Sequence, residues 1–259
     1  MKQITSRANP TFKTLKSLAE DAREQRRTGM TLLEGYHLVA SYCDKIGLPE
    51  RLIVSEHGAA QPEIQSLCST LSGVEMLLLH DSLHRELSGL ATPAGIAAVI
   101  RIPKASTPAV TGSCVLLDGL QDAGNVGSIL RSAAAAGIAN IFLGAGCAGV
   151  WTPRVLRAAQ GAHFDLHLYE QADLGEVMAN FPGTTLAATA HAAEPLYRQD
   201  LRGNVAWLFG NEGGGISPAL EVVAAKRVNI PLARGSESLN VAAAAAICLF
   251  EQVRQNSHG

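Results

Sequence analysis

Apolar positions follow helical and strand-like spacings along the chain, and one polar stretch interrupts them. That stretch, residues 103–108, carries two prolines between apolar runs and is typical of an interdomain linker. We therefore expect a small α/β domain over residues 1–104 and a second domain over 105–259. The elements predicted in the first part are helices over 13–27 and 35–46 and strands over 52–55, 76–79 and 96–102.

Beyond the linker, short apolar strands alternate with helical patterns. The predicted strands are 115–118, 141–143, 166–169, 185–188, 206–209 and 228–231. The predicted helices are 126–136, 153–160, 174–180, 217–225 and 239–254. Such alternation favours a mostly parallel sheet covered by helices, in which ligands bind beyond the carboxyl ends of the strands. Functional residues are expected in the loops that follow strands.

The composition is that of a globular chain, with 259 residues, 47% hydrophobic and 17% charged, which excludes a disordered protein. The longest apolar run, Val241–Phe250, is half of the roughly 20 residues that a membrane-spanning helix needs. No apolar signal segment follows the first residues, so we expect a cytoplasmic protein without membrane contact. The five cysteines form no C-x-x-C pair and have no histidine at ligand spacing, so neither disulfides nor a metal site is expected.

Positive charge is concentrated near the start of the chain. The net charge is −2, which argues against a protein that coats nucleic acid indiscriminately. Residues 2–27, however, include seven basic and three acidic residues, a local net charge of +4. This basic arm is compatible with contacts to a phosphate backbone, and charge alone fits a solvated helix face equally well.

A glycine motif, Gly144-Ala145-Gly146-Cys147-Ala148-Gly149, follows a predicted strand and matches the G-x-G-x-x-G pattern of dinucleotide-binding proteins. In that fingerprint the helix begins inside the motif, so that its N-terminal amides meet the pyrophosphate. Here Thr152-Pro153 indicates a helix that begins only after the third glycine. We therefore do not favour a nicotinamide site.

Three other loops after predicted strands combine glycine with polar side chains. In Leu117–Ala133, Asn125 is expected to cap a helix that carries Arg131 just under two turns later. In Trp207–Ser217, four glycines surround Glu212, which can bind a hydroxyl or a cation or act as a base. In Ile230–Ala244, Ser238 and Asn240 stand at the start of an alanine-rich helix, where they can cap it or contact a ligand.

In the same order, these loops resemble the three signature motifs of the SpoU (TrmH-like) family, the RNA ribose 2′-O-methyltransferases of the SPOUT superfamily. The resemblance covers Val115–Glu251 and rests on Asn-Val-Gly-x-Ile-x-Arg, Phe-Gly-x-Glu-x-x-Gly, and Ile-Pro followed by Ser-Leu-Asn-Val-Ala. The first part of the chain resembles the small ribosomal-protein-like RNA-binding domain that many members carry, through Ile4–Pro10, Leu33–Gly35 and Thr92–Ala97.

The resemblance implies a C-terminal SPOUT domain, an α/β domain with a parallel sheet and a deep trefoil knot, that binds S-adenosylmethionine as methyl donor. It also implies a homodimer whose active sites borrow residues across the interface. The positions it assigns to catalysis are Asn125, Arg131, Glu212, Ser238 and Asn240. Those it assigns to donor binding are Leu208, Gly210, Ile230 and Leu239. Those expected to face RNA are Arg7, Asn9, Lys13, Arg23, Arg26 and Arg27.

The chemistry suits these residues, because the ribose 2′-hydroxyl is a poor nucleophile and the donor's methyl group is already activated. Positioning and deprotonation are therefore the tasks left to the protein. A guanidinium stays charged in proteins, so we interpret Arg131 as a phosphate anchor rather than a base. Ribosomal RNA is the favoured substrate over transfer RNA, by analogy of the N-terminal domain. The alternatives are a catalytically silent RNA-binding homologue and, on the glycine motif, a nicotinamide-dependent oxidoreductase.

Overall fold

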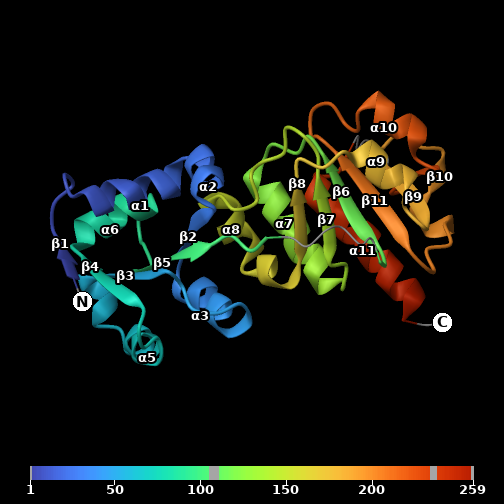
Figure 1. The fold of residues 1–259 in the computed structure, drawn as a ribbon. Helices are drawn as coiled ribbons and strands as arrows, with labels where there is room; N and C mark the ends of the chain where they lie inside the picture. The colour runs from blue at the N-terminus through green and yellow to red at the C-terminus, as the bar shows by residue number, and fades with distance from the viewer. Residues whose placement is uncertain (1, 105–110, 234–237, 258–259) are drawn as a thin grey trace. The chain divides into compact units, whose positions relative to one another are not determined.

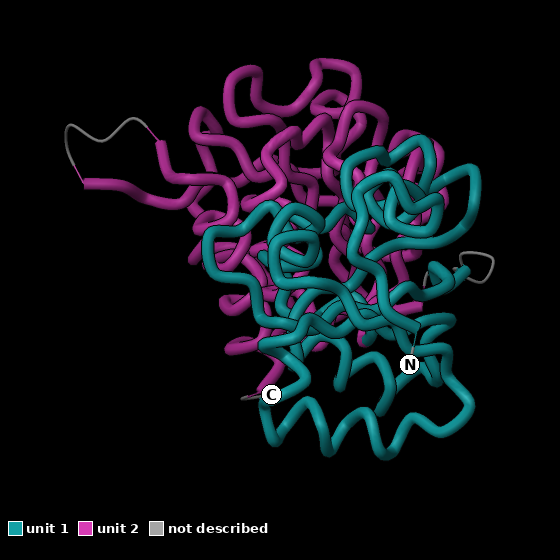
Figure 2. Tube along the Cα trace, turned by 90° about the vertical axis from the view of Figure 1, so that its left-hand side faces the viewer, with its two compact units in different colours: residues 1–104, 151–164 teal, residues 105–150, 165–259 magenta. Residues whose placement is uncertain are grey.

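The computed structural model describes residues 2–104, 111–233 and 238–257, and the chain forms two compact units (Figure 2). The first unit contains residues 1–104 together with 151–164, and the second contains 105–150 and 165–259. The first unit thus ends where the linker is predicted, but it also takes in residues that the sequence assigns to the second domain. Each unit has its own sheet.

A five-stranded mixed sheet forms the centre of the first unit (Figure 1). Its strands are β1 Lys2–Ile4, β2 Met30–Glu34, β3 Arg51–Ser55, β4 Glu75–Leu79 and β5 Ile96–Arg101. They lie in the order β1-β4-β3-β5-β2, with β1, β4 and β3 parallel and β5 antiparallel to β3 and β2. The helices of residues 1–104 are α1 Pro10–Glu20, α2 Ala22–Thr28, α3 Tyr36–Lys45, α4 Glu56–Ala59, α5 Pro62–Thr70 and α6 Asp81–Ser88.

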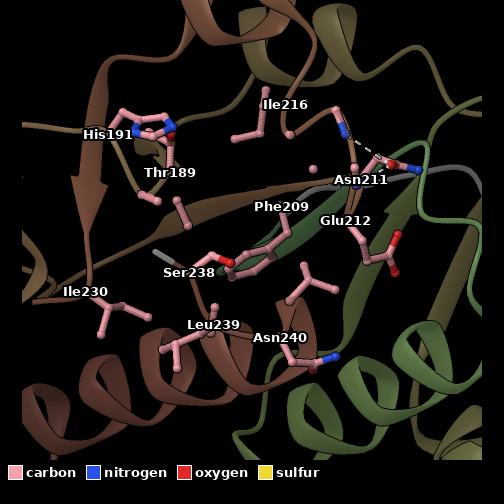
Figure 3. Close-up of a pocket in the computed structure, with 18 of the residues that line it drawn as sticks. Thr189, His191, Phe209, Asn211, Glu212, Ile216, Ile230, Ser238, Leu239 and Asn240 are labelled. Atoms are coloured by element: carbon pink, nitrogen blue, oxygen red, sulfur yellow. Dashed lines mark hydrogen bonds between the residues drawn. The ribbon is translucent and has the colours of Figure 1, made fainter. Parts of the chain in front are cut away.

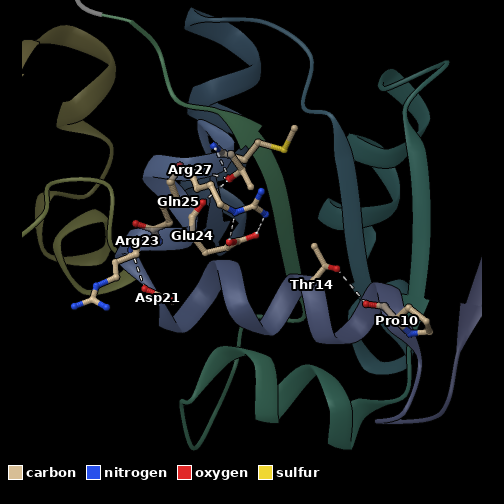
Figure 4. Close-up of polar contacts among 9 residues, drawn as sticks. Pro10, Thr14, Asp21, Arg23, Glu24, Gln25 and Arg27 are labelled. Carbon is tan, nitrogen blue, oxygen red and sulfur yellow. Dashed lines mark hydrogen bonds and ion pairs between the residues drawn. The ribbon is translucent and has the colours of Figure 1, made fainter.

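The single helix predicted over residues 13–27 is wrong, because the structure has two helices there (Figure 4). Asp21 has an extended backbone, with φ −118° and ψ 107°, and its side chain accepts a hydrogen bond from the N–H of Arg23 at 2.8 Å. This residue therefore ends α1 and caps α2. The apolar spacing runs through the break without a signal, so periodicity could not reveal it.

Residues 151–164, with helix α8 Pro153–Ala159, are held in the first unit by buried polar contacts. The hydroxyl of the fully buried Thr31 donates to the carbonyl of Trp151 at 2.7 Å. Arg157 Nη1 lies 3.0 Å from Glu34 Oε2, whose side chain is 5% exposed, and Ser88 Oγ donates to the other carboxylate oxygen. Because an unpaired buried charge is costly, these contacts fix the segment firmly.

A seven-stranded parallel sheet forms the centre of the second unit (Figure 1). Its strands are β6 Cys114–Asp118, β7 Asn140–Leu143, β8 His167–Glu170, β9 Thr184–Ala188, β10 Glu194–Pro195, β11 Val205–Gly210 and β12 Lys226–Asn229. They lie in the order β10-β12-β9-β11-β6-β7-β8. The helices are α7 Ala123–Ala135, α9 Leu174–Ala179, α10 Pro218–Val223 and α11 Val241–Asn256.

Helices cover both faces of this sheet, as the predicted alternation requires. On one face, Leu208 of β11 packs with Leu174 and Met178 of α9 in a single apolar cluster, against which α10 also packs. On the other face, α7 and α11 contact each other, and the buried Trp207 Nε1 donates to Gln252 of α11 at 2.7 Å. The neighbouring side chains of Trp207 and Leu208 therefore point to opposite faces of the sheet, as the two-residue repeat of a strand requires.

The predicted fold class, an α/β protein with a parallel sheet in the second part and a small α/β unit before it, is confirmed. The trefoil knot implied by the resemblance stays a prediction. Within the described residues, no helix is long and apolar enough to cross a membrane. Burial raises the pKa of the Cys114 and Cys248 thiols to about 12, so both stay protonated at neutral pH.

Candidate active site

A cavity of about 630 Å³ opens at the carboxyl edge of the parallel sheet (Figure 3). The residues that follow β9, β11 and β12 line it, together with the start of α11. Its volume lies in the range of about 300–1,000 Å³ that holds small ligands and cofactors. Apolar side chains such as Phe209, Ile230 and Leu239 line it beside the carboxylate of Glu212. This mixed lining suits a nucleoside with a charged tail, and S-adenosylmethionine has that chemistry.

The glycine loop after β11 is folded tightly on itself. A Cβ on Gly210 would lie 2.2 Å from both Gly215 C and Ile216 N, so only glycine fits there. The side chain of Asn211 donates to the carbonyl of Gly119 at 2.7 Å and accepts from the N–H of Gly213 at 2.8 Å. The close approach at Gly210 is thus between two parts of the loop itself. The loop is therefore shaped before any ligand binds.

Three of the predicted catalytic residues form a hydrogen-bonded chain. Asn240 Oδ1 caps α11 by accepting from the N–H groups of Ala242 at 3.0 Å and Ala243 at 3.2 Å. Its Nδ2 then donates to Asn125 Oδ1 at 2.9 Å, which leaves Asn125 Nδ2 to donate to Glu212 Oε1 at 2.7 Å. Because each amide has only one oxygen and one NH₂ group, the helix cap fixes the direction of the whole chain. Glu212 must accept, and its ionised form does so best.

The sequence predicted that Asn125 caps α7, and this prediction is wrong. The cap is Asp122, whose carboxylate accepts from the N–H of Asn125 at 2.7 Å. Two residues of similar capping strength lie three positions apart, and the sequence did not distinguish them. Because Asp122 caps the helix, the side chain of Asn125 is left available to bond with Glu212 and Asn240.

The predicted donor-binding residues are only partly brought together. Gly210, Ile230 and Leu239 line the cavity, and so do Ser238 and Asn240. Leu208 does not, because its side chain is fully buried in the cluster with α9, on the face of β11 opposite Phe209. Residues 234–237, which belong to the third motif, lie outside the described residues.

Arg131 is not among the residues that line the cavity. Its side chain is exposed on α7, and within the described residues no hydrogen bond or ion pair engages it. Arg131 lies six positions after Asn125 along the helix, which places the two on different faces of α7. The single chain therefore brings Glu212, Asn125 and Asn240 together but leaves Arg131 outside the site.

Two ionisable residues at the cavity escaped the sequence analysis. His191 follows β9, and Glu221 on α10 has a carboxylate oxygen 3.6 Å from Arg227 Nη1. The only sequence signal for His191 is that it follows a strand of the parallel sheet, the location where ligand-binding residues are expected. Neither residue belongs to one of the three motifs.

The residues expected to face RNA in the first unit differ in their contacts. Arg7 Nε lies 2.6 Å from Glu86, and Arg27 Nη2 lies 2.6 Å from Glu24 on its own helix (Figure 4). Asn9 caps α1 by accepting from Thr11 N–H at 2.9 Å. Within the described residues, the exposed side chains without an ion pair in this set are Lys13, Arg23 and Arg26.

The glycine motif at Gly144–Gly149 has no helix of its own. The next helix, α8, begins at Pro153 and belongs to the first unit. A dinucleotide site needs the helix N-terminus directly against the motif. The structure therefore gives this loop no pyrophosphate-binding geometry.

Family models agree with the motif-based prediction. The model of the SpoU rRNA methylase family matches residues 112–250, more than half of the chain. The chain belongs to this family. An MRM3-like substrate-binding domain model matches residues 9–98, the larger part of the first unit.

This SpoU methylase is similar to two bacterial relatives over almost their whole length. It is 31% identical to the 23S rRNA (guanosine(2553)-2′-O)-methyltransferase RlmP of Bacillus subtilis, covering 96% of this chain and 98% of that protein. It is 28% identical to the 23S rRNA (uridine(2479)-2′-O)-methyltransferase of Streptomyces viridochromogenes, covering 100% and 94%. The structure of the SpoU methyltransferase AviRb from Streptomyces viridochromogenes in complex with AdoMet superposes with a TM-score of 0.86 at 26% identity, covering 97% and 100%.

These matches confirm the predicted family, the enzyme class and S-adenosylmethionine as the methyl donor of the family. The roles of the individual residues stay predictions, since the comparisons name no residue of this chain.

Proposed function

We propose that this protein transfers a methyl group from S-adenosylmethionine to a ribose 2′-hydroxyl of ribosomal RNA and works as a homodimer. The observation that carries the reaction is the chain from Asn240 through Asn125 to Glu212 at the edge of a cavity of nucleoside size. The bound donor supplies an activated methyl group. The residues of this protein must then hold the ribose in line with it and help its hydroxyl lose a proton.

The hydrogen-bonded chain gives each residue a distinct task in this proposal. Asn240 ties the chain to the N-terminus of α11, so the amide planes are fixed before substrate arrives. Glu212, held at 2.7 Å by Asn125, keeps a negative charge at the cavity. That charge attracts the cationic sulfonium of S-adenosylmethionine and orients the hydroxyl groups of the incoming ribose. Ser238, also at the cavity, offers a hydroxyl for the ribose or its phosphate.

A second protomer would complete the site. A reaction on RNA needs a cation for the phosphate beside the target ribose, and Arg131 lies outside the cavity of its own chain. One face of α11 carries Ala243, Ile247 and Phe250. Ala243 is exposed to solvent, and Phe250 is 47% exposed. Exposed apolar residues at this helical spacing are typical of a protein interface. A two-fold dimer would bury this stripe and bring Arg131 to the partner's cavity.

Ribosomal RNA is proposed as the substrate because the similar proteins from Bacillus subtilis and Streptomyces viridochromogenes are named as 23S rRNA methyltransferases. The first unit adds exposed cations at Lys13, Arg23 and Arg26. Such residues place the enzyme on RNA through phosphates, whereas the target nucleotide is selected by the shape of an unpaired region.

The direct test is transfer of labelled methyl from S-adenosylmethionine to total RNA from cells that lack this protein. The modified nucleotide is mapped by its resistance to alkaline cleavage. We expect one labelled 2′-hydroxyl in the large-subunit RNA. Label only in transfer RNA would refute the substrate, and donor binding without transfer to any RNA or ribosomal particle would favour a silent homologue.

Mixing two inactive variants tests the shared site. Arg131→Ala and Glu212→Ala homodimers should each lose at least about 100-fold in transfer rate, since each removes a charged group from the site. After subunit exchange, half of the dimers are mixed, and each mixed dimer has one site with both residues intact. The mixture should regain about a quarter of wild-type activity. If both residues acted within one chain, mixing would restore nothing.

A further inference from the structure

The residues described so far at the cavity do not account for the negative charge of the donor's carboxylate. Its lining includes the carboxylates of Glu212 and Glu221, and within the described residues it includes no lysine or arginine. The acidic groups suit the sulfonium and ammonium cations of S-adenosylmethionine. The donor also carries a carboxylate, which the like charges of Glu212 and Glu221 disfavour unless a hydrogen-bond donor or cation holds it away from them.

Among the described residues that line the cavity, His191 is the one whose side chain can carry a positive charge. It lies in the loop after β9 and is exposed to solvent at the mouth of the cavity. Figure 3 shows it beside Thr189, on the opposite side of the cavity from Glu212 and Asn240. The imidazole of His191 and the carboxylate of Glu212 therefore lie on opposite sides of the cavity.

We propose that His191 binds the carboxylate of the donor's methionine portion, with its imidazole donating a charge-assisted hydrogen bond. This proposal rests on the methyltransferase function proposed above. The two carboxylates of the cavity already have partners, since Glu221 lies 3.6 Å from Arg227 and Glu212 accepts from Asn125. His191 is therefore left to bind the carboxylate of the donor by charge complementarity. The sulfonium then lies toward Glu212, where the ribose must be methylated, and the carboxylate points to the opposite side.

The position of His191 favours the donor over an RNA phosphate. His191 shares the cavity wall with Phe209, Ile230 and Leu239, whereas the cations proposed to contact RNA, Lys13, Arg23 and Arg26, lie in the first unit. These apolar residues fit a nucleoside rather than a phosphate backbone. His191 is thus a specificity residue for ligands that keep the amino-acid tail.

The test compares two ligands that differ only in that tail. Isothermal titration calorimetry measures binding of S-adenosylhomocysteine and of 5′-methylthioadenosine to the full-length chain. His191→Asn should weaken S-adenosylhomocysteine about fivefold, as expected for an ion pair near the surface, and change 5′-methylthioadenosine by less than about twofold. His191→Lys should retain tight binding, and His191→Glu should weaken S-adenosylhomocysteine further by like-charge repulsion.

His37→Asn is the matched control, because His37 is also exposed but lies on α3 in the first unit. It should leave both ligands unchanged. Equal losses for both ligands in His191→Asn, or no loss for either, would overturn the assignment and leave the methyltransferase function standing. Unchanged S-adenosylhomocysteine binding with weakened RNA binding would reassign His191 to RNA. If the wild-type protein bound neither ligand, the proposed function itself would fail.

Discussion

Replacing Asn125 by aspartate should break the hydrogen-bonded chain at its centre while hardly changing its shape. Asparagine and aspartate are nearly isosteric, but aspartate has no NH₂ group to donate to Glu212. Asn125→Asp would set two carboxylates at the 2.7 Å separation that now joins Asn125 Nδ2 to Glu212 Oε1. The bond from Asn240 Nδ2 would survive, since the introduced carboxylate still accepts.

The cost can be worked out from that distance. Two unit charges 2.7 Å apart repel by about 1.5 kcal/mol even at the dielectric constant of water, and the lost hydrogen bond adds about 0.5–1.5 kcal/mol. An aspartate in the first turn of α7 gains about 0.5 kcal/mol from the helix dipole. We therefore expect Asn125→Asp to destabilise the protein by about 2 kcal/mol. In a chain of this size, 1 kcal/mol corresponds to about 2–4 °C in Tm.

In a protein that also carries Glu212→Gln, the effect of Asn125→Asp on the free energy of unfolding should change sign. In that background, the introduced glutamine donates its NH₂ group to the introduced aspartate, no like charges meet, and the dipole gain makes Asn125→Asp slightly stabilising. Thermal unfolding of the wild type, both single variants and the double variant gives a coupling energy, expected at about 2.5 kcal/mol. A coupling below about 0.5 kcal/mol would refute the direction assigned to the chain. Transfer assays on the same four proteins separate the need for the Glu212 charge from the need for the network.

Two further predictions concern the first unit. His84 is 1% exposed, its ring nitrogens have no partner within the described residues, and burial lowers its pKa to about 4. The unfolded chain, with a histidine pKa near 6.5, therefore binds the proton first, and stability falls as the pH drops from 6.5 to 4. Between pH 7 and pH 5 the wild type should lose about 2 kcal/mol more than His84→Leu, measured by urea unfolding, and parallel curves would contradict this. Replacing Arg23 and Arg26 by alanine should weaken RNA binding and reduce the slope of log K against log salt by about 1.4–1.8, whereas Arg27→Ala, with its charge paired to Glu24, should change it by less than about 0.5.

The second unit was more predictable than the first because its strands β6, β7 and β11 are buried on both faces. Continuous apolar runs such as Val115–Leu117 and Ala206–Phe209 stand out from the polar loops, and they lie in β6 and β11. In the first unit, β1 has only three residues and lies at the edge of the sheet, so it left no recognisable pattern. The break at Asp21 escaped for another reason, since it depends on a side-chain cap that periodicity does not record.

Within the site, sequence motifs located the residues but not their connections. Asn125, Glu212 and Asn240 lie up to 115 positions apart, and only the parallel sheet brings the ends of β6 and β11 and the start of α11 to one edge. Once they meet, the direction of the network follows from a local rule: the cap of α11 consumes the oxygen of Asn240. Arg131 shows the opposite case. Its motif is as clear as that of Asn125, yet it lies on another face of α7. The catalytic role predicted for it therefore depends on the homodimer proposed above.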